Sequence, residues 1–217
     1  MVGLLVVLAG AGCHRKRKPR ILPVSKTPVG AKFEDPGKTF AVAIPQGWVQ
    51  QDAQGLGGIV LLLQPQGDTS GTSLNIQAEY CGEDTMLEEY CRLSDENSAR
   101  MVEGFRPLKK RELGNLGGAP AAILRFAFTR NGKSYEVLQY TAINPPEVYQ
   151  VVLTAPRGSL KQHEDAYYAL LNSWKFTRAW NVQAKPRSLT GGKPAAQPSS
   201  PSHKAPQPKV HKGGGGQ

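Results

Sequence analysis

The chain has 217 residues, of which 39% are hydrophobic, and its formal net charge is +10. Residues 1–33 carry +7 and residues 179–217 carry +6, whereas residues 34–178 hold 14 basic and 17 acidic side chains and so carry −3. This distribution indicates one domain between two basic tails, and it excludes a folded core that is itself a basic nucleic-acid-binding domain.

The N-terminal segment is an apolar run that ends at a cysteine. Residues 2–11 carry no charge, and Gly10, Ala11 and Gly12 directly precede Cys13. The run is shorter than the roughly 20 apolar residues that a membrane-spanning helix needs, and its length is typical of a signal peptide. Because small residues fit a signal-peptidase cleft, we expect residues 1–13 to be a lipoprotein signal segment.

These residues, with Leu8 and Ala9 upstream, resemble the lipobox of bacterial lipoproteins. The resemblance implies that the thiol of Cys13 carries acyl chains such as palmitate. It also implies a membrane-anchored protein of the cell envelope, facing the periplasm or the outer membrane. No charged residue precedes Cys13, and basic residues 15–18 follow it, an arrangement that disfavours export. The alternative is therefore an apolar end on a cytosolic protein.

Both tails are predicted to lack a packed core. Residues 179–217 contain prolines spaced among Lys, Ser, Gln and Ala, and residues 213–216 are four consecutive glycines. Such a composition buries too little apolar surface to offset the entropy lost on ordering. Its charge favours weak, salt-sensitive contact with anionic lipid or wall polymer, or with nucleic acid in the cytosol. A solvated linker is the alternative, and we interpret residues 14–37 as a second basic linker.

The first half of the expected domain, residues 38–178, contains three strands and a helix. Apolar or alternating runs predict strands over residues 39–44, 58–63 and 73–80. Thr85 and Glu88 have the spacing of a capping box, which predicts a helix over residues 85–104.

The second half contains the clearest hairpin signal of the chain. Asn131 and Gly132 lie between alternating runs, which predicts paired strands over residues 122–128 and 133–143. Another strand is expected over residues 148–154. Ser159 and Gln162 offer a second capping box, which predicts a C-terminal helix. The pattern indicates an α+β fold, in which an antiparallel sheet is flanked by helices.

Four segments, in this order and spacing, resemble the PsbP/DcrB-like domain over about residues 38–177. The resemblance implies a PsbP-like α/β/α sandwich with a non-catalytic binding or accessory role, and it places no catalytic residue and no cofactor. The segments are residues 40–48 (FAVAIPQGW), 116–121 (LGGAPA), 148–151 (VYQV) and 171–176 (LNSWKF).

Residues 34–178 offer little for catalysis, and we predict that the protein is not an enzyme. Nucleophilic catalysis by Ser or Cys usually needs a His, and the one histidine here, His163, is expected to face water at the start of a helix. Residues 68–71 (DTSG) are interpreted as a turn between strands. Gly55, Gly57 and Gly58 are interpreted as a hairpin loop, because a strand rather than a helix follows them.

We expect no metal site. Four carboxylates gather between residues 83 and 89, where a helix dipole stabilises them without a cation; a bound divalent ion is the alternative. His203 and His211 lie in the C-terminal tail without a second cluster at ligand spacing.

Cys81 and Cys91 are disulfide candidates. One lies at a strand end and the other in the first predicted helix, and they form an even pair once Cys13 is acylated. A disulfide over this short loop contributes roughly 2 to 3 kcal/mol in the loop-entropy model. Two reduced thiols, with Cys91 packed in the core, are the alternative.

These observations predict a non-catalytic cell-envelope lipoprotein that is held at a membrane by Cys13 and binds a protein partner of unknown identity. The alternative is a cytosolic protein whose basic tails bind nucleic acid or other polyanions. The acidic core argues against nucleic acid, as does the lack of aromatic residues among the basic residues of the tails.

Overall fold

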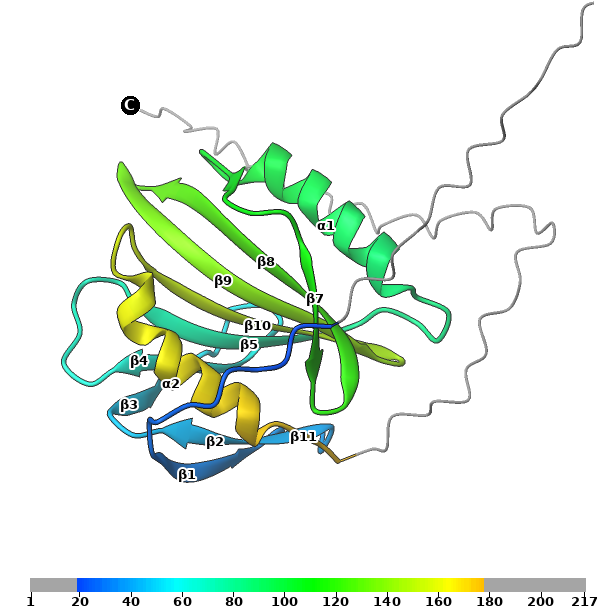
Figure 1. Ribbon diagram of the computed structural model, residues 1–217, viewed down its shortest axis with the longest axis horizontal. Coiled ribbons are helices and arrows are strands. Elements are labelled where there is room, and N and C mark those ends of the chain that lie inside the picture. Colours follow the sequence, from blue (N-terminus) through cyan, green and yellow to red (C-terminus); the bar gives the residue numbers. More distant parts are fainter. Residues whose placement is uncertain (1–18, 178–217) are drawn as a thin grey trace, which may run out of the picture. The chain divides into compact units, whose positions relative to one another are not determined.

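The computed structural model describes residues 19–177, which form two antiparallel sheets and two helices (Figure 1). The strands are β1 (Val29–Glu34), β2 (Phe40–Pro45), β3 (Trp48–Gln51), β4 (Ile59–Pro65), β5 (Ser73–Tyr80), β6 (Arg106–Pro107), β7 (Glu112–Leu116), β8 (Ala119–Arg130), β9 (Lys133–Asn144), β10 (Glu147–Pro156) and β11 (Lys175–Phe176). The helices are α1 (Leu87–Met101) and α2 (Leu160–Ser173).

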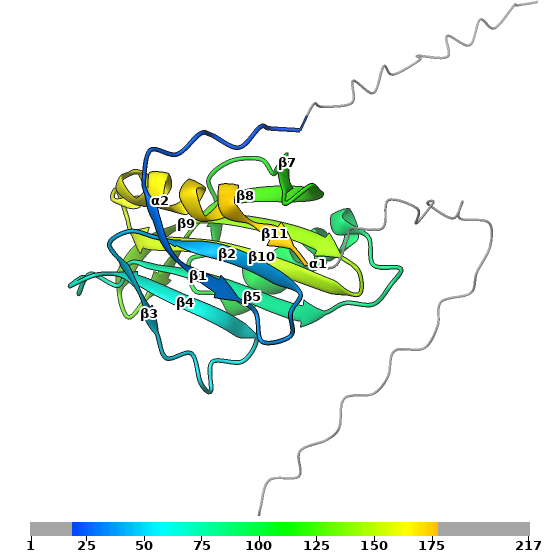
Figure 2. The same cartoon turned by 90° about the horizontal axis from the view of Figure 1, so that it is seen from below.

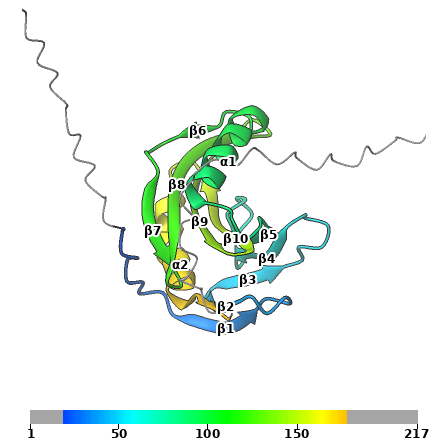
Figure 3. The same cartoon turned by 90° about the vertical axis from the view of Figure 1, so that its right-hand side faces the viewer.

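The small sheet has the strand order β1-β2-β11, and the large sheet has the order β3-β4-β5-β10-β9-β8-β6. Strand β7 pairs with β8 as well. Helix α2 packs against β2 of the small sheet and against β10 of the large one, as Figure 2 shows. Helix α1 lies on the other face of the large sheet, over β8 and β9 (Figure 3). The predicted α+β fold, an antiparallel sheet flanked by helices, is confirmed.

The hairpin between β8 and β9 forms where it was predicted. Asn131 and Gly132 have φ values of 52° and 70°, so both central residues of the turn adopt the left-handed conformation that a two-residue hairpin requires. Arg130 and Lys133 close the pair directly beside the turn. This turn fixes the register of the two longest strands of the large sheet.

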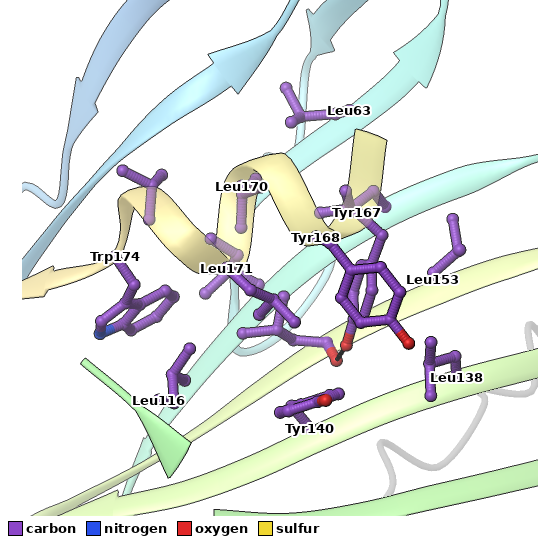
Figure 4. Packing of buried hydrophobic residues seen from close by; sticks show 14 of the residues in the cluster. Leu63, Leu116, Leu138, Tyr140, Leu153, Tyr167, Tyr168, Leu170, Leu171 and Trp174 are labelled. Carbon is purple, nitrogen blue, oxygen red and sulfur yellow. Dashed lines mark hydrogen bonds between the residues drawn. The ribbon is translucent and has the colours of Figure 1, made fainter. Parts of the chain in front are cut away.

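The core lies between the large sheet and α2. Alternate residues of a strand point to opposite faces, and one face of β9 and β10 presents Tyr140, Tyr149 and Val151 to the core. Figure 4 shows Tyr140 close to Tyr167 of α2, and their ring centroids are 5.9 Å apart. The buried hydroxyl of Tyr167 donates a hydrogen bond of 2.7 Å to the Val151 carbonyl. Aromatic rings thus join α2 to the sheet.

A second aromatic group closes the other end of the core. The rings of Phe40 and Trp174 stack with centroids 4.4 Å apart, and Tyr149 meets Trp174 edge-on at 5.7 Å. Gly117, in the turn between β7 and β8, lies against this group with φ +56°, and a Cβ atom there would come within 2.5 Å of Trp174 Cδ1. The close approach of backbone to indole therefore requires glycine.

Residues 20–34, which the sequence assigned to a basic linker, belong to the folded unit. The backbone N–H of Arg20 donates to the Leu113 carbonyl at 2.7 Å. The carboxylate of Asp165 accepts hydrogen bonds from the Lys26 N–H and the Thr27 hydroxyl. Strand β1 then pairs with β2. The fold therefore begins before the boundary expected at residue 38. The sequence did not reveal β1, because this edge strand has mostly exposed side chains and so lacks a hydrophobic pattern.

Both helices begin near the predicted residues, but neither capping box forms. The hydroxyl of Thr85 donates to the Cys81 carbonyl, and α1 starts after Met86 without a side-chain cap. The hydroxyl of Ser159 donates to the Pro156 carbonyl at 2.7 Å instead of accepting from α2. In both cases the hydroxyl bonds to the turn that precedes the helix, a local alternative that Ser and Thr commonly adopt. Helix α1 also ends at Met101, before the expected Gly104.

Candidate functional site

The face of the large sheet on the α1 side is polar in its centre. Tyr140, Val151 and Ile76 point into the core, so their neighbours along the strands point to the opposite face. The register places Gln150 of β10 directly between Gln77 of β5 and Thr141 of β9. The next row holds Asn75 and Gln139, on either side of Val152. We call these five polar residues the amide face: Asn75, Gln77, Gln139, Thr141 and Gln150.

Side-chain hydrogen bonds join members of the amide face, one of them from β9 to β10 and the others within β9 and within β5. The amide of Gln139 donates to the Thr141 hydroxyl at 3.0 Å and to the carbonyl oxygen of the Gln150 side chain at 3.3 Å. On β5, the amide of Gln77 donates to Asn75 at 3.3 Å. Buried amides need such partners, because an unpaired polar group away from water is destabilising. The polar groups of the amide face are therefore paired largely with one another.

Tyr90 connects the amide face to α1. The amide of Gln150 donates to the Tyr90 hydroxyl at 2.6 Å, and that hydroxyl donates in turn to the Glu79 carboxylate. Burial, followed by the hydrogen bond to Glu79, raises the pKa of the Tyr90 phenol well above its ordinary value. The phenol therefore stays protonated at neutral pH and acts as a donor.

Helix α1 itself sits on the sheet through few apolar contacts. Cys91 is the one residue of this described helix that is fully buried. Asp95 forms an ion pair with Arg111, just before β7. Together with Tyr90, this ion pair makes the contact of α1 with the rest of the domain largely polar. Such a surface suits hydrogen bonding to a polar ligand or to another protein surface, and the described hydrogen-bond partner of the Thr141 hydroxyl is the Gln139 amide rather than a base.

The histidine weighed as a catalytic candidate has no catalytic partner among the described residues. His163 is half-buried, not fully exposed as expected, and its ring meets Trp48 edge-on with centroids 6.0 Å apart. No described hydrogen bond joins it to a serine or a cysteine. Its described contact is this packing against Trp48, near the start of α2.

Residues 68–71 form the turn that the sequence predicted. The Asp68 carboxylate accepts hydrogen bonds from the Ser70 hydroxyl at 3.0 Å and from the Thr72 N–H at 3.1 Å. Burial acts to raise the pKa of Asp68, but the hydrogen bonds from Ser70 and Thr72 outweigh it and the net pKa is lowered. The Asp68 carboxylate thus stabilises the turn that contains it.

The carboxylates near the start of α1 do not form a metal site. Glu89 pairs with Arg92 at 2.7 Å, and no group of three or more His, Cys, Asp or Glu residues within 19–177 is arranged to hold a metal ion. No helix in that same span is long and apolar enough to cross a bilayer. Cys13, His203 and His211 lie outside the described residues.

Cys81 and Cys91 are free thiols in this structure, Cys81 half-buried and Cys91 buried. Burial raises the pKa of both thiols. Cys81 follows the end of β5, and Cys91 points inward from the second turn of α1. The disulfide inferred from the sequence stays a prediction.

Sequence reasoning missed the amide face. It recognised the alternation of residues 73–80 but did not connect it with the polar residues of the strands over 133–143 and 148–154. A usable signal was present, because Gln139 and Thr141 alternate with the core residues Leu138 and Tyr140. Only the strand order brings these positions together.

Comparisons with known proteins point to one fold. No protein-family model and no curated protein matches the sequence. Among solved structures, cyanobacterial PsbP (CyanoP) from Synechocystis is similar with a TM-score of 0.53 and 11% identity, over 67% of this chain and 91% of that one. LpqN of Mycobacterium tuberculosis, described as involved in cell envelope biogenesis, is similar with a TM-score of 0.54 and 17% identity, over 74% and 90%.

A Bacteroides thetaiotaomicron protein is similar with a TM-score of 0.50 and 17% identity, over 69% of this chain and 49% of that one. At these identities the likeness shows the fold alone. The chain therefore has a PsbP-like fold, as the sequence motifs indicated.

Proposed function

Starting from the PsbP-like fold, we propose that this protein is a non-catalytic accessory protein of the cell envelope, attached to a membrane by lipid on Cys13. The observation that carries the proposal is the fold shared with LpqN, which is described as involved in cell envelope biogenesis. The sequence before Cys13 adds independent support, because it resembles a lipobox. In this proposal the lipid anchor holds the small domain at the membrane.

The chemistry of the described residues supports a binding role. The amide face offers paired amide and hydroxyl groups rather than a nucleophile with a base. His163 packs edge-on against Trp48, and none of the described hydrogen bonds joins it to a serine or a cysteine. Such a surface fits recognition of a polar partner, and we assign the accessory role to α1 and to the half-buried members of the amide face beside it, Asn75, Gln77 and Gln150.

The distribution of charge supports attachment at an anionic surface. Residues 19–177 hold 16 basic and 17 acidic side chains, a net charge of −1, so the +10 of the chain comes from the segments outside them. Basic residues next to a lipid anchor add about 1 kcal/mol each at an anionic membrane surface. The lipid supplies most of the attachment in this proposal, and the tails strengthen it.

Metabolic labelling with a fatty acid tests the anchor. Cells expressing the natural chain, Cys13→Ser and the control Cys81→Ser are labelled and separated into soluble and membrane fractions. We expect label and membrane retention for the natural chain and for Cys81→Ser, and loss of both for Cys13→Ser.

Mass spectrometry of the mature N-terminus provides the opposing outcome. An intact, unmodified Met1 on soluble protein would overturn the proposal and favour the cytosolic alternative. Retention on nucleic acid that disappears when residues 179–217 are deleted would then identify the function of that tail.

A further inference from the structure

A cleft with a mixed polar and apolar lining lies at the end of the large sheet that contains the β8–β9 hairpin. Its volume is about 180 Å³. It is lined by residues from four separate parts of the chain: the segment after α1, strand β6, the β8–β9 hairpin and the segment after β10. The lining residues are Gly104, Arg106, Ala127, Phe128, Thr129, Ser134 and Arg157.

The arginines at this end differ from the other described arginines. Residues 19–177 contain eight arginines, and five of them pair with a carboxylate within 4.0 Å. The other three are Arg106, Arg130 and Arg157. Arg130 lies over the ring of Tyr135, with its guanidinium carbon 4.7 Å from the centroid. Arg106 and Arg157 line the cleft with exposed side chains and take part in none of the described ion pairs.

Backbone pairing sets where these two arginines emerge. Arg106 is opposite Ala127 in the pairing of β6 with β8. The N–H of Arg157 donates to the Ser134 carbonyl at 3.0 Å, just beyond the end of β10. Two cationic side chains from distant parts of the sequence therefore start from fixed points on the rim of one cleft.

Hydroxyl groups provide further donors. Thr129 and Ser134 are opposite each other in the β8–β9 register, and both line the cleft. The Thr129 side chain lies against Gly104, where a Cβ atom would come within 2.8 Å of Thr129 Oγ1. A larger residue at position 104 would press on this hydroxyl, so a glycine there leaves room for the Thr129 hydroxyl in the cleft.

We infer that this cleft binds a phosphate group. Guanidinium forks match phosphate oxygens in pairs, and hydroxyls supply additional hydrogen bonds. The cleft, with a volume of about 180 Å³, is large enough for a phosphate and a few attached atoms. The inference is independent of the lipid anchor, because none of the lining residues belongs to the tails.

Nuclear magnetic resonance of the 217-residue chain carrying Cys13→Ser tests the inference with inorganic phosphate as the probe. We expect saturable shifts of the backbone amides of Gly104, Thr129 and Ser134. The double variant Arg106→Gln/Arg157→Gln loses charge-assisted hydrogen bonds, so binding should weaken by roughly tenfold or more. Arg100→Gln is the matched control, since Arg100 is an exposed arginine on α1, outside the cleft.

Vesicles distinguish the source of the phosphate. Phosphatidylcholine vesicles with and without phosphatidic acid are compared, using the same three proteins. Retention on phosphatidic acid that depends on Arg106 and Arg157, without saturable binding of inorganic phosphate, assigns the cleft to a lipid headgroup. Saturable binding of inorganic phosphate assigns it to a soluble phosphate. Equal behaviour of the double variant and Arg100→Gln with both probes would overturn the inference, whatever the state of Cys13.

Discussion

Nη1 of Arg125 on β8 lies 2.6 Å from Oε1 of Glu164 on α2, and the two side chains are only 18% and 21% exposed. Burial alone would lower the pKa of Arg125, but the hydrogen bond to Glu164 and the negative charge of that carboxylate together outweigh it, so the net pKa is raised. The pair ties the large sheet to the helix that covers its core. Removing one partner leaves the other charge partly buried, which is more destabilising than losing an exposed pair.

Replacing the carboxylate therefore tests this connection. We expect Glu164→Gln to lower the free energy of unfolding by about 1 to 3 kcal/mol, measured by urea denaturation. The control is Glu96→Gln on α1, whose partners Arg92 and Arg100 are exposed, and its effect should stay below about 1 kcal/mol. Equal losses in the two variants would contradict a structural role for the Arg125–Glu164 pair.

Two neighbouring tyrosines should respond differently to loss of their hydroxyls. Tyr167 donates to the Val151 carbonyl, whereas the buried hydroxyl of Tyr140 has no hydrogen-bond partner in the described part of the chain. We expect Tyr167→Phe to reduce the free energy of unfolding by about 1 kcal/mol. Tyr140→Phe should be neutral or stabilising, because it removes an unpaired polar atom. Thermal denaturation of both variants checks the difference, and a larger loss for Tyr140→Phe would refute it.

Adjacent glycines in the β7–β8 turn separate backbone strain from crowding. Gly117 and Gly118 have φ values of +56° and +92°, but only a Cβ atom at Gly117 meets neighbours, at 2.5 Å from Trp174 and 3.1 Å from Phe176. Gly118→Ala should reduce stability by about 1 to 2 kcal/mol through strain alone. Gly117→Ala should add about 1 to 3 kcal/mol for overpacking. Chemical denaturation measures the stability of both variants. Similar losses of stability would show that the rings of Trp174 and Phe176 move to make room for the added Cβ atom.

The buried thiols give a pH dependence with a defined sign. Burial raises the pKa of Cys91 in the folded protein. A thiol whose folded pKa is raised contributes stability below its unfolded pKa of about 8.5, and this contribution is lost as the pH rises through the folded value. In reduced protein, stability should fall as the pH rises above about 8.5, and less steeply in Cys91→Ala. Identical slopes would exclude Cys91 as the titrating group.

Alkylation distinguishes the two thiols and tests the disulfide prediction. Under reducing conditions a thiol reagent should modify half-buried Cys81 before buried Cys91. Protein isolated from the envelope without reductant gives the second comparison. Resistance of both cysteines to alkylation, together with a mass lower by two hydrogens, would establish the disulfide. Two modified cysteines would exclude it.

Much of the fold follows from local patterns. The Asn131-Gly132 turn specifies its hairpin because its two residues tolerate positive φ, and the alternation of the flanking strands places their core faces. The helix starts were located to within about a turn by the spacing of the expected capping boxes. The caps were not, because Thr85 and Ser159 had a competing carbonyl nearby, and a spacing rule does not choose between two acceptors.

The sequence by itself determined the class of fold, the position of the central hairpin and the separation of a near-neutral core from basic ends. Those properties depend on residues close together in the chain, where steric preference and hydrophobic alternation act directly. Only the tertiary structure decided that Tyr90 would meet Gln150 and Glu79, or that Arg106 and Arg157 would line one cleft. Such meetings depend on strand order and register, which arise when distant segments bury their apolar faces together.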